Sequence, residues 1–300
     1  MTSLRYAAIT PARNEAENLP RLAASLASQT VPPDAWVVVD DGSTDGTPGV
    51  IEGFAADHPW SLVVPSPGVS TRAGPLQSGR REGRDVLAFN AGVAALPSRP
   101  DVVLKLDADV SLEPDFFERL LGEFEADPLL GIAGGVCLEL ERGEWRERFV
   151  TGTHVRGATR AYRWKCFEDV SPLVERLGWD GLDEAKATLQ GWHVRSIPGL
   201  PFYHHRPVGR RDGARSSWES QGATARFMGY RFWYLALRSF FWARRDPRAL
   251  GMIVGWLKDA RARAPIYDDP AVVAQVRRER SLRMLPLRMR QALGAAPGPR

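Results

Sequence analysis

The stretch Trp36-Val-Val-Val-Asp40-Asp41-Gly42-Ser43-Thr44-Asp45 joins an apolar run to a cluster of acids and turn residues. A second junction of the same kind, Val102-Val-Leu-Lys-Leu-Asp107-Ala108-Asp109, follows later in the chain. Short runs rich in Val and Leu are typical of buried strands. The carboxyl ends of neighbouring parallel strands open on one crevice, where ligands bind in open α/β sheets. We therefore expect both acidic clusters to face the same crevice.

Acids that converge in one crevice repel each other, because nearby like charges raise each other's pKa values. A divalent cation that carries a diphosphate relieves this repulsion. Asp-Gly-Ser after a strand is also ordinary turn chemistry, so a single junction of this kind is weak evidence. Two junctions in this order indicate a site for a metal and a phosphorylated ligand.

Apolar runs alternate with helical patterns along the first two thirds of the chain. Strands or extended stretches are expected at residues 6–10, 36–40, 61–64, 102–106, 132–140, 193–197 and 202–205. Helices are expected over Leu19–Leu26, from about residue 47, and at 84–95, 114–126 and 180–190. This alternation predicts a Rossmann-like α/β fold, with a mostly parallel central sheet flanked by helices. Residues 65–83, rich in Pro, Gly, Ser and Arg, are expected to form a functional loop.

Charge is distributed unevenly along the 300 residues, whose net charge is +4. Residues 1–205 carry 20 basic and 29 acidic side chains, whereas residues 206–300 carry 20 and 7. An acidic body suits a metal and a nucleotide, and a basic tail suits an anionic surface. We expect one domain over residues 1–207, followed by a basic, helical region over 208–300.

Residues 223–257 interleave aromatic side chains with arginines, and their longest apolar run, Ala249–Leu257, is too short to span a bilayer. This pattern is typical of helices that lie on an anionic membrane, although helices packed on the preceding domain also fit it. The amino terminus lacks the features of a signal peptide. Cys137 and Cys166, the two cysteines, fit a reducing compartment. We therefore expect a cytoplasmic protein, docked peripherally on the inner face of the plasma membrane.

Four segments resemble the motifs of inverting family 2 glycosyltransferases of the GT-A fold. They are Ile9-Thr10-Pro11-Ala12-Arg13-Asn14-Glu15, Val39-Asp40-Asp41-Gly42-Ser43-Thr44-Asp45, Gly83-Arg84 through Phe89-Asn90-Ala91-Gly92, and Asp107-Ala108-Asp109. Their order is that of the family. The resemblance implies a GT-A fold with the nucleotide sugar bound over about residues 1–110 and the acceptor side over about 111–207.

The resemblance also implies roles for single residues. Asp41 is expected to accept a hydrogen bond from the imide of uracil, and Glu15 and Asp107 to lie near the ribose hydroxyls. Mg²⁺ or Mn²⁺ is expected at Asp109 and Asp107, with His204 and His205 as further candidate ligands. The other positions expected in the donor site are Thr10, Pro11, Arg13, Arg84, Ala108 and Arg163.

The catalytic base is expected on a late helix. Family members carry Glu-Asp there, with a basic residue six positions after the Asp and a glycine eleven after it. Trp179-Asp180 has Lys186 and Gly191 at these offsets, so Asp180 is the expected base and Trp179 replaces the Glu. An alternative alignment places Asp183-Glu184 there, and Asp183 lies on nearly the same helix face as Asp180.

The resemblance implies transfer of a sugar, from a UDP-sugar first of all, to a hydroxyl of a glycan or lipid-linked acceptor. No nucleic-acid partner is expected. A nucleotidyltransferase is one alternative, but its glycine-rich phosphate loop is missing from Pro11-Ala12-Arg13-Asn14-Glu15. A catalytically silent module that binds nucleotide sugar or membrane lipid is another. Metal-dependent hydrolysis of a nucleotide sugar separates that module from an enzyme.

Overall fold

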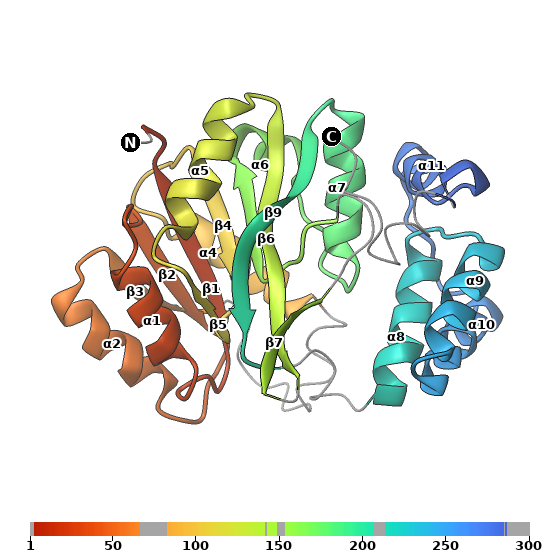
Figure 1. The fold of residues 1–300 in the computed structure, drawn as a ribbon, viewed down its shortest axis with the longest axis horizontal. Helices are drawn as coiled ribbons and strands as arrows, with labels where there is room; N and C mark the ends of the chain where they lie inside the picture. Colours follow the sequence, from red (N-terminus) through yellow and green to blue (C-terminus); the bar gives the residue numbers. More distant parts are fainter. Residues whose placement is uncertain are drawn as a thin grey trace.

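The computed structural model describes residues 3–66, 83–141, 143–148, 154–206, 214–284 and 286. Its centre is a curled, nine-stranded sheet with helices on both faces (Figure 1). The strand order is β3-β2-β1-β4-β8-β6-β9-β5, and β7 pairs with β6 outside this path. The loop predicted over residues 65–83 lies almost entirely outside the described residues.

The first half of the sheet is parallel. Its strands are β1 (Tyr6–Ala12), β2 (Ala35–Asp40), β3 (Ser61–Pro65) and β4 (Val102–Leu106). The helices between them are α1 (Leu19–Ala27), α2 (Thr47–Asp57) and α4 (Arg84–Ala94). These elements confirm the predicted alternation, and their bounds differ by at most two residues from those expected.

Side chains on these strands alternate between two apolar layers. On β2, Trp36 and Val38 face the layer that contains α1 and α5 (Phe116–Ala126), whereas Val37 and Val39 face the layer that contains α4. Successive side chains of a strand point to opposite faces, so a strand covered on both faces is apolar throughout. This double burial explains the uninterrupted apolar run that ends at Asp40.

The second half of the sheet is mixed. Antiparallel pairs join β8 (Thr159–Arg163) to β4 and to β6 (Leu130–Glu141), and β6 runs parallel to β9 (His193–His204). The two stretches predicted around residues 193–197 and 202–205 form this one long strand. Two short strands complete the sheet: β5 (Val110–Leu112) pairs with β9, and β7 (Glu144–Glu147) pairs with β6.

Two helices follow β8 and cover the α4 face of the sheet. They are α6 (Trp164–Val170) and α7 (Trp179–Leu189). Gly178 precedes α7 with a φ of 97°, and a Cβ there would lie 2.5 Å from Cγ2 of Thr224. Only glycine satisfies both the backbone conformation and the close approach. The start of α7 is therefore fixed against the helices that follow it in the chain.

The described residues from 214 onward are mainly helical. They contain α8 (Ala214–Phe227), α9 (Phe232–Ala243), α10 (Gly251–Arg261) and α11 (Pro270–Glu279), with 3₁₀ turns at Pro247–Leu250 and Leu282–Met284. In Figure 1 these helices lie beyond α7, away from β1–β3. An apolar cluster joins α8 and α11 to α7 through Leu182, Ala185, Phe227, Met228, Val272 and Val276. Throughout the described ranges, every helix is too short or too polar to cross a membrane.

Candidate active site

Three loops meet at the carboxyl edge of the parallel strands. Because β1 lies between β2 and β4 and runs parallel to both, the loop after β1 is flanked by Asp41 on one side and by Asp107 on the other. The backbone N–H of Asp41 donates to the carbonyl of Ala12 over 2.8 Å. The acidic clusters of the two junctions therefore lie at one edge of the sheet, which is where open α/β sheets bind ligands.

Asn14 ties the first loop to the second. Its φ of 54° is left-handed, a conformation that asparagine tolerates better than most residues. Its N–H donates to Oγ of Ser43 over 3.0 Å, and its Oδ1 accepts from the N–H of Thr44 over 2.8 Å. The N–H of Glu15 donates to Oγ1 of Thr47 over 2.8 Å. These hydrogen bonds hold the loop after β1, which contains Asn14, against the loop after β2, which contains Asp41.

Arginines hold the carboxylate of Asp41. Nη2 of Arg84 donates to Oδ1 over 2.7 Å, and Nη1 of Arg13 lies 3.9 Å from Oδ2. The side chain of Asp41 keeps 14% of its surface exposed. It is therefore an oriented acceptor with an open side, which suits recognition of an N–H group.

The side chains of Thr10, Pro11 and Ala108 pack within the sheet and its apolar layer. Oγ1 of Thr10 accepts from the indole N–H of Trp36 over 2.9 Å inside the core, and Pro11 pairs with Val39 across β1 and β2. Ala108 is buried in the apolar layer of α1 and α5. Their side chains set the backbone at the strand ends that carry the acids.

Lys105 is a buried charge that belongs to none of the expected motifs. Its Nζ lies 2.5 Å from Oδ1 of Asp107, 3.9 Å from Oδ2 of Asp85 and 5.9 Å from the ring centroid of Trp179. The signal for it was a lysine inside the apolar run Val102–Leu106. Since Trp179 precedes Asp180, Lys105 links the acids after β4 to the start of α7.

Asp109 faces His204. The short strand β5 places Val110 opposite His204 on β9, and Nε2 of His204 lies 3.2 Å from Oδ1 of Asp109. One ligating atom from each of Asp107, Asp109 and His204 lies within 4.8 Å of the others. Two carboxylates and an imidazole at this spacing fit a divalent cation such as Mn²⁺.

Positive charge gathers around Asp109. Burial alone lowers the pKa of His204, but the side chains of Asp109, Cys137 and Glu139 around it raise that pKa to about 11. Nε of Arg206 also lies 3.2 Å from Oδ2 of Asp109. A protonated imidazole and a guanidinium therefore balance this carboxylate, a role that a bound divalent cation would take over from them.

Arg206 also contacts Glu15, whose Oε2 accepts from Nδ2 of Asn18 over 2.8 Å as well. Burial raises the pKa of Glu15, and hydrogen bonding by Asn18 and the charge of Arg206 oppose that shift. Through Arg206, the loop after β1 meets the end of β9.

His205 points away from this cluster. Its Nε2 lies 2.7 Å from Oγ of Ser111, and its ring packs edge-on against Trp145 at 5.3 Å between centroids. The backbone N–H of His205 donates to the carbonyl of Asp109 over 2.9 Å, but of the two imidazoles only that of His204 contacts the Asp109 carboxylate.

Asp183 and Glu184 lie in a buried ion-pair network around Arg160. Nη2 and Nε of Arg160 donate to the two oxygens of Asp183 over 2.5 and 3.2 Å, and Tyr162 donates its hydroxyl to the same carboxylate. Oε1 of Glu184 accepts from Nη1 of Arg160 over 3.1 Å and from the N–H of Val155 over 2.8 Å. Burial raises the pKa of Asp183, and the guanidinium opposes that shift.

Asp180 is the open acid of α7. It lies in the first turn, and its side chain is 32% exposed. Its Oδ2 lies 3.7 Å from Nε2 of His154, whose Nδ1 lies 3.1 Å from Oε2 of Glu184. Burial lowers the pKa of His154, but the charges of Glu184 and Asp180 outweigh it and raise the pKa. Asp180 has the exposure that a base needs to reach an acceptor.

Arg163 lies at the other end of the sheet. It pairs with Val102, at the amino end of β4, whereas Asp107 follows the carboxyl end. Its guanidinium donates to the carbonyls of Phe124, Asp127 and Leu130 over 2.6, 3.1 and 3.1 Å. The structure does not bring Arg163 to the acidic cluster.

Comparison with known proteins gives a family match over the amino-terminal half of the chain. Residues 7–166 match the family described as glycosyl transferase family 2. The succinoglycan biosynthesis protein ExoA of Rhizobium meliloti (strain 1021) is 30% identical over 122 residues, which are 40% of this chain and 33% of ExoA. The match thus spans about a third of that curated relative.

Solved structures share the fold at low sequence identity. The mannosyltransferase PcManGT from Pyrobaculum calidifontis, in complex with GDP-Man and Mn²⁺, superposes with a TM-score of 0.57 at 19% identity, over 97% of this chain and 79% of that one. Residues 1–349 of TarS from S. aureus, in complex with UDP, give a TM-score of 0.52 at 18% identity, over 74% and 64%. These neighbours confirm the predicted GT-A type of α/β fold.

Proposed function

This chain belongs to glycosyl transferase family 2, and on that premise we propose that it moves a sugar from a nucleoside-diphosphate sugar to an acceptor hydroxyl, with inversion at the anomeric carbon. The observation that carries the proposal is the convergence of Asp107, Asp109 and His204 within 4.8 Å. This cluster lies at the sheet edge that also holds Asp41. Mg²⁺ and Mn²⁺ bind few protein carboxylates and keep positions for substrate phosphates, which this cluster allows.

The nucleotide base is proposed to bind at Asp41. Arg84 donates to Oδ1 of this carboxylate, whereas Arg13 lies 3.9 Å from Oδ2, beyond hydrogen-bond distance, so Oδ2 can accept the imide N–H of uracil. UDP is the first candidate for this reason. Guanine also offers N–H donors, and PcManGT was solved with GDP-Man, so GDP is the second. Glu15 and Asp107 are proposed to face the ribose hydroxyls.

Catalysis is proposed to need a cation beside the leaving diphosphate and a carboxylate base on the opposite face of the sugar. A divalent cation held by Asp109 would neutralise the departing diphosphate. Asp180 takes the proton of the acceptor hydroxyl as that hydroxyl attacks, which requires hydrogen-bond reach between them. Asp183 is less suited to this role because Arg160 and Tyr162 already occupy its oxygens.

The acceptor is proposed to be a glycan or a lipid-linked saccharide met at an anionic membrane surface. ExoA, the curated relative, is described as a succinoglycan biosynthesis protein. Leu250, just before α10, and Val254 and Leu257 within it follow each other at helical spacing and are exposed, and Phe240 of α9 is 59% exposed. Exposed arginines lie on these helices, between them and at their outer ends: Arg231, Arg244, Arg245, Arg248, Arg261 and Arg263.

Apolar side chains flanked by arginines are the pattern of helices that dock on anionic lipid. In this proposal residues 1–207 carry catalysis, and residues 208–300 bring it to the inner face of the plasma membrane.

A thermal-shift screen of UDP-, GDP- and dTDP-sugars, each with Mn²⁺ or with chelator, tests the donor and the metal together. A ligand that binds only the native state at about 100 times its Kd adds about 2.7 kcal/mol to the free energy of unfolding. We expect one nucleotide to raise Tm by several degrees with Mn²⁺ and much less with chelator. Slow, Mn²⁺-dependent hydrolysis of the matching sugar donor is expected as well. A Tm rise without any hydrolysis would indicate a binding module instead.

A further inference from the structure

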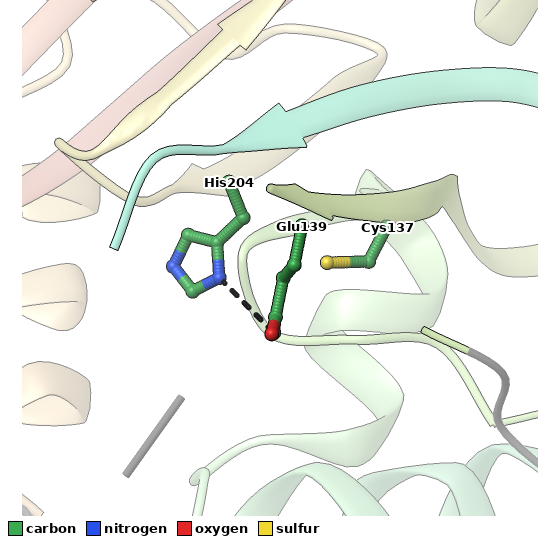
Figure 2. Close-up of side chains that lie close together, drawn as sticks. All are labelled: Cys137, Glu139 and His204. Carbon is green, nitrogen blue, oxygen red and sulfur yellow. Dashed lines mark ion pairs between the residues drawn. The ribbon is translucent and has the colours of Figure 1, made fainter. Parts of the chain in front are cut away.

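Cys137, Glu139 and His204 form a buried cluster beside the proposed metal site (Figure 2). Cys137 and Glu139 are two residues apart on β6, so their side chains lie on the same face of the sheet. Glu139 pairs in register with His204 on the neighbouring strand β9. The side chains of all three are buried. The carboxylate of Glu139 and the imidazole of His204 therefore lie side by side on one buried face of the sheet.

His204 directs its two ring nitrogens to two different carboxylates. Nε2 lies 3.2 Å from Oδ1 of Asp109, and Nδ1 lies 3.8 Å from Oε1 of Glu139, the contact drawn in Figure 2. A neutral imidazole carries its proton on one nitrogen and binds a metal through the other. The nitrogen that faces a carboxylate on the far side of the ring keeps the proton, so that carboxylate determines the tautomer.

We propose that Glu139 is a positioning residue that accepts the Nδ1 proton of His204 and thereby turns its unprotonated Nε2 toward the divalent cation at Asp109. This inference rests on the proposed function. Oε1 of Glu139 and Nδ1 of His204 are both buried, and neither has a hydrogen bond within the described residues. Donation from Nδ1 to Oε1 satisfies both atoms, which is the arrangement that metal-bound histidines usually have.

Arg148 supports this assignment. Its Nε lies 3.1 Å from Oε2 of Glu139, so one oxygen is held by the guanidinium and Oε1 is left to face the histidine. The ion pair also fixes the rotamer of a carboxylate that is itself 2% exposed. A carboxylate held in this way orients the ring with little conformational freedom.

The cluster could instead hold a metal of its own, since the sulfur of Cys137, a carboxylate oxygen of Glu139 and a nitrogen of His204 lie within 4.8 Å. That arrangement requires Nδ1 of His204 as a ligand, while Nε2 faces the cation at Asp109. One imidazole would then have to lose both ring protons. Arg148 also adds positive charge beside Glu139, which opposes a second cation. Cys137 is therefore the matched control for the proposal.

The test measures the affinity of the full chain for Mn²⁺ by isothermal titration calorimetry. UDP or GDP is present, whichever of the two stabilises the protein. Glu139→Gln is expected to weaken Mn²⁺ binding about 10- to 100-fold, because the amide no longer fixes the tautomer of His204. Cys137→Ala is expected to bind Mn²⁺ as the wild type does. In a His204→Ala background, Glu139→Gln is expected to add no further loss.

Other outcomes overturn the inference. Unchanged Mn²⁺ affinity in folded Glu139→Gln rejects the positioning role, and an equal loss in Cys137→Ala indicates a buried metal site instead. Wild type that binds no Mn²⁺ with either nucleotide rejects the proposed function as well. If Glu139→Gln does not fold, ¹⁵N NMR of wild type with Mg²⁺ and nucleotide decides. A proton on Nδ1 of His204 is expected, and a proton on Nε2 contradicts the proposal.

Discussion

Arg160 and Asp183 form a fully buried ion pair, in which Nη2 of the guanidinium lies 2.5 Å from Oδ1 of the carboxylate. Because of this pair, Asp180 and Asp183, which are three residues apart on α7, have different roles. Asp183 balances a charge in the interior, whereas Asp180 opens to solvent in the first turn. The chemistry expected of each follows from this difference in environment.

Asp180→Asn is expected to lower turnover by about 10²–10⁴-fold, because the amide cannot take the proton of the acceptor hydroxyl. The affinity for the nucleotide is expected to stay the same, since the interaction is needed only in the transition state. Steady-state kinetics and nucleotide titration measure the two quantities separately. Comparable losses of turnover and of nucleotide affinity would contradict the assignment.

Asp183→Asn is the matched control, because the same change is made one turn further along the helix. Removing one partner of a buried ion pair costs about 3–5 kcal/mol, so this variant is expected to lose stability to urea. If Asp183→Asn is instead stable but inactive while Asp180→Asn remains active, the base is Asp183 and the assignment is off by one turn.

Asp109→Asn is expected to abolish transfer and to remove the Mn²⁺-dependent part of nucleotide binding. An amide supplies no charge to the cation, and Asp107 would remain as the one carboxylate of the cluster. Calorimetric titration of nucleotide with and without Mn²⁺ measures the effect. Wild-type activity in this variant, or full activity of the wild type in excess chelator, would exclude the metal role.

The sequence predicts those parts of the sheet whose pattern is local. β2 and β4 are buried on both faces, so their residues form continuous apolar runs that are easy to recognise. β8 was not predicted, because Arg160 and Arg163 interrupt its apolar pattern. The charge of Arg160 is balanced by Asp183 and Glu184, which come much later in the chain, so no local pattern identifies this strand.

The candidate site shows the same limit. Motifs were enough to single out Asp41, Asp107 and Asp109, because each follows directly on a recognisable strand. The choice between His204 and His205 depends on the register of β9 against β5 and β6, since a shift of one residue turns a side chain to the other face. That register places His204 opposite both Val110 and Glu139.

His154 is expected to make stability depend on pH. The charges of Glu184 and Asp180 outweigh burial and raise the pKa of His154 above its ordinary value of about 6.5. The imidazolium therefore stabilises the fold fully below about pH 6.5, and this contribution is lost as the pH rises through the folded-state pKa. His154→Gln should lower Tm at pH 6, by a margin that shrinks toward pH 9. A constant difference in Tm across that range would contradict this reasoning.

Gly255→Ala is expected to loosen the packing of α10 on α8. A Cβ at Gly255 would lie 1.9 Å from the carbonyl oxygen of Glu219, so the two helices would have to separate. Overpacking of this kind costs about 1–3 kcal/mol, which thermal denaturation can measure. Gly122→Ala in α5 is the control, because a Cβ there meets nothing within 4 Å and alanine favours a helix. Equal stability of the two variants would count against the close helix contact.

Membrane docking is expected to show in a flotation assay with phosphatidylglycerol vesicles. Each Lys or Arg near an anionic surface contributes roughly 1 kcal/mol, so five in contact outweigh the modest cost of orienting the protein. Binding is expected at low salt and is expected to be lost near about 0.5 M salt, where the Debye length is only a few ångströms.

Phe240→Ser and Leu257→Ser should weaken this flotation, because both side chains are exposed on the helices rich in arginine. Leu129→Ser is the matched control, since Leu129 is 54% exposed but lies between α5 and β6. No flotation at low salt would defeat the membrane proposal. An equal loss in Leu129→Ser would show that α9 and α10 are not the docking surface, because general apolar exposure would then explain the binding.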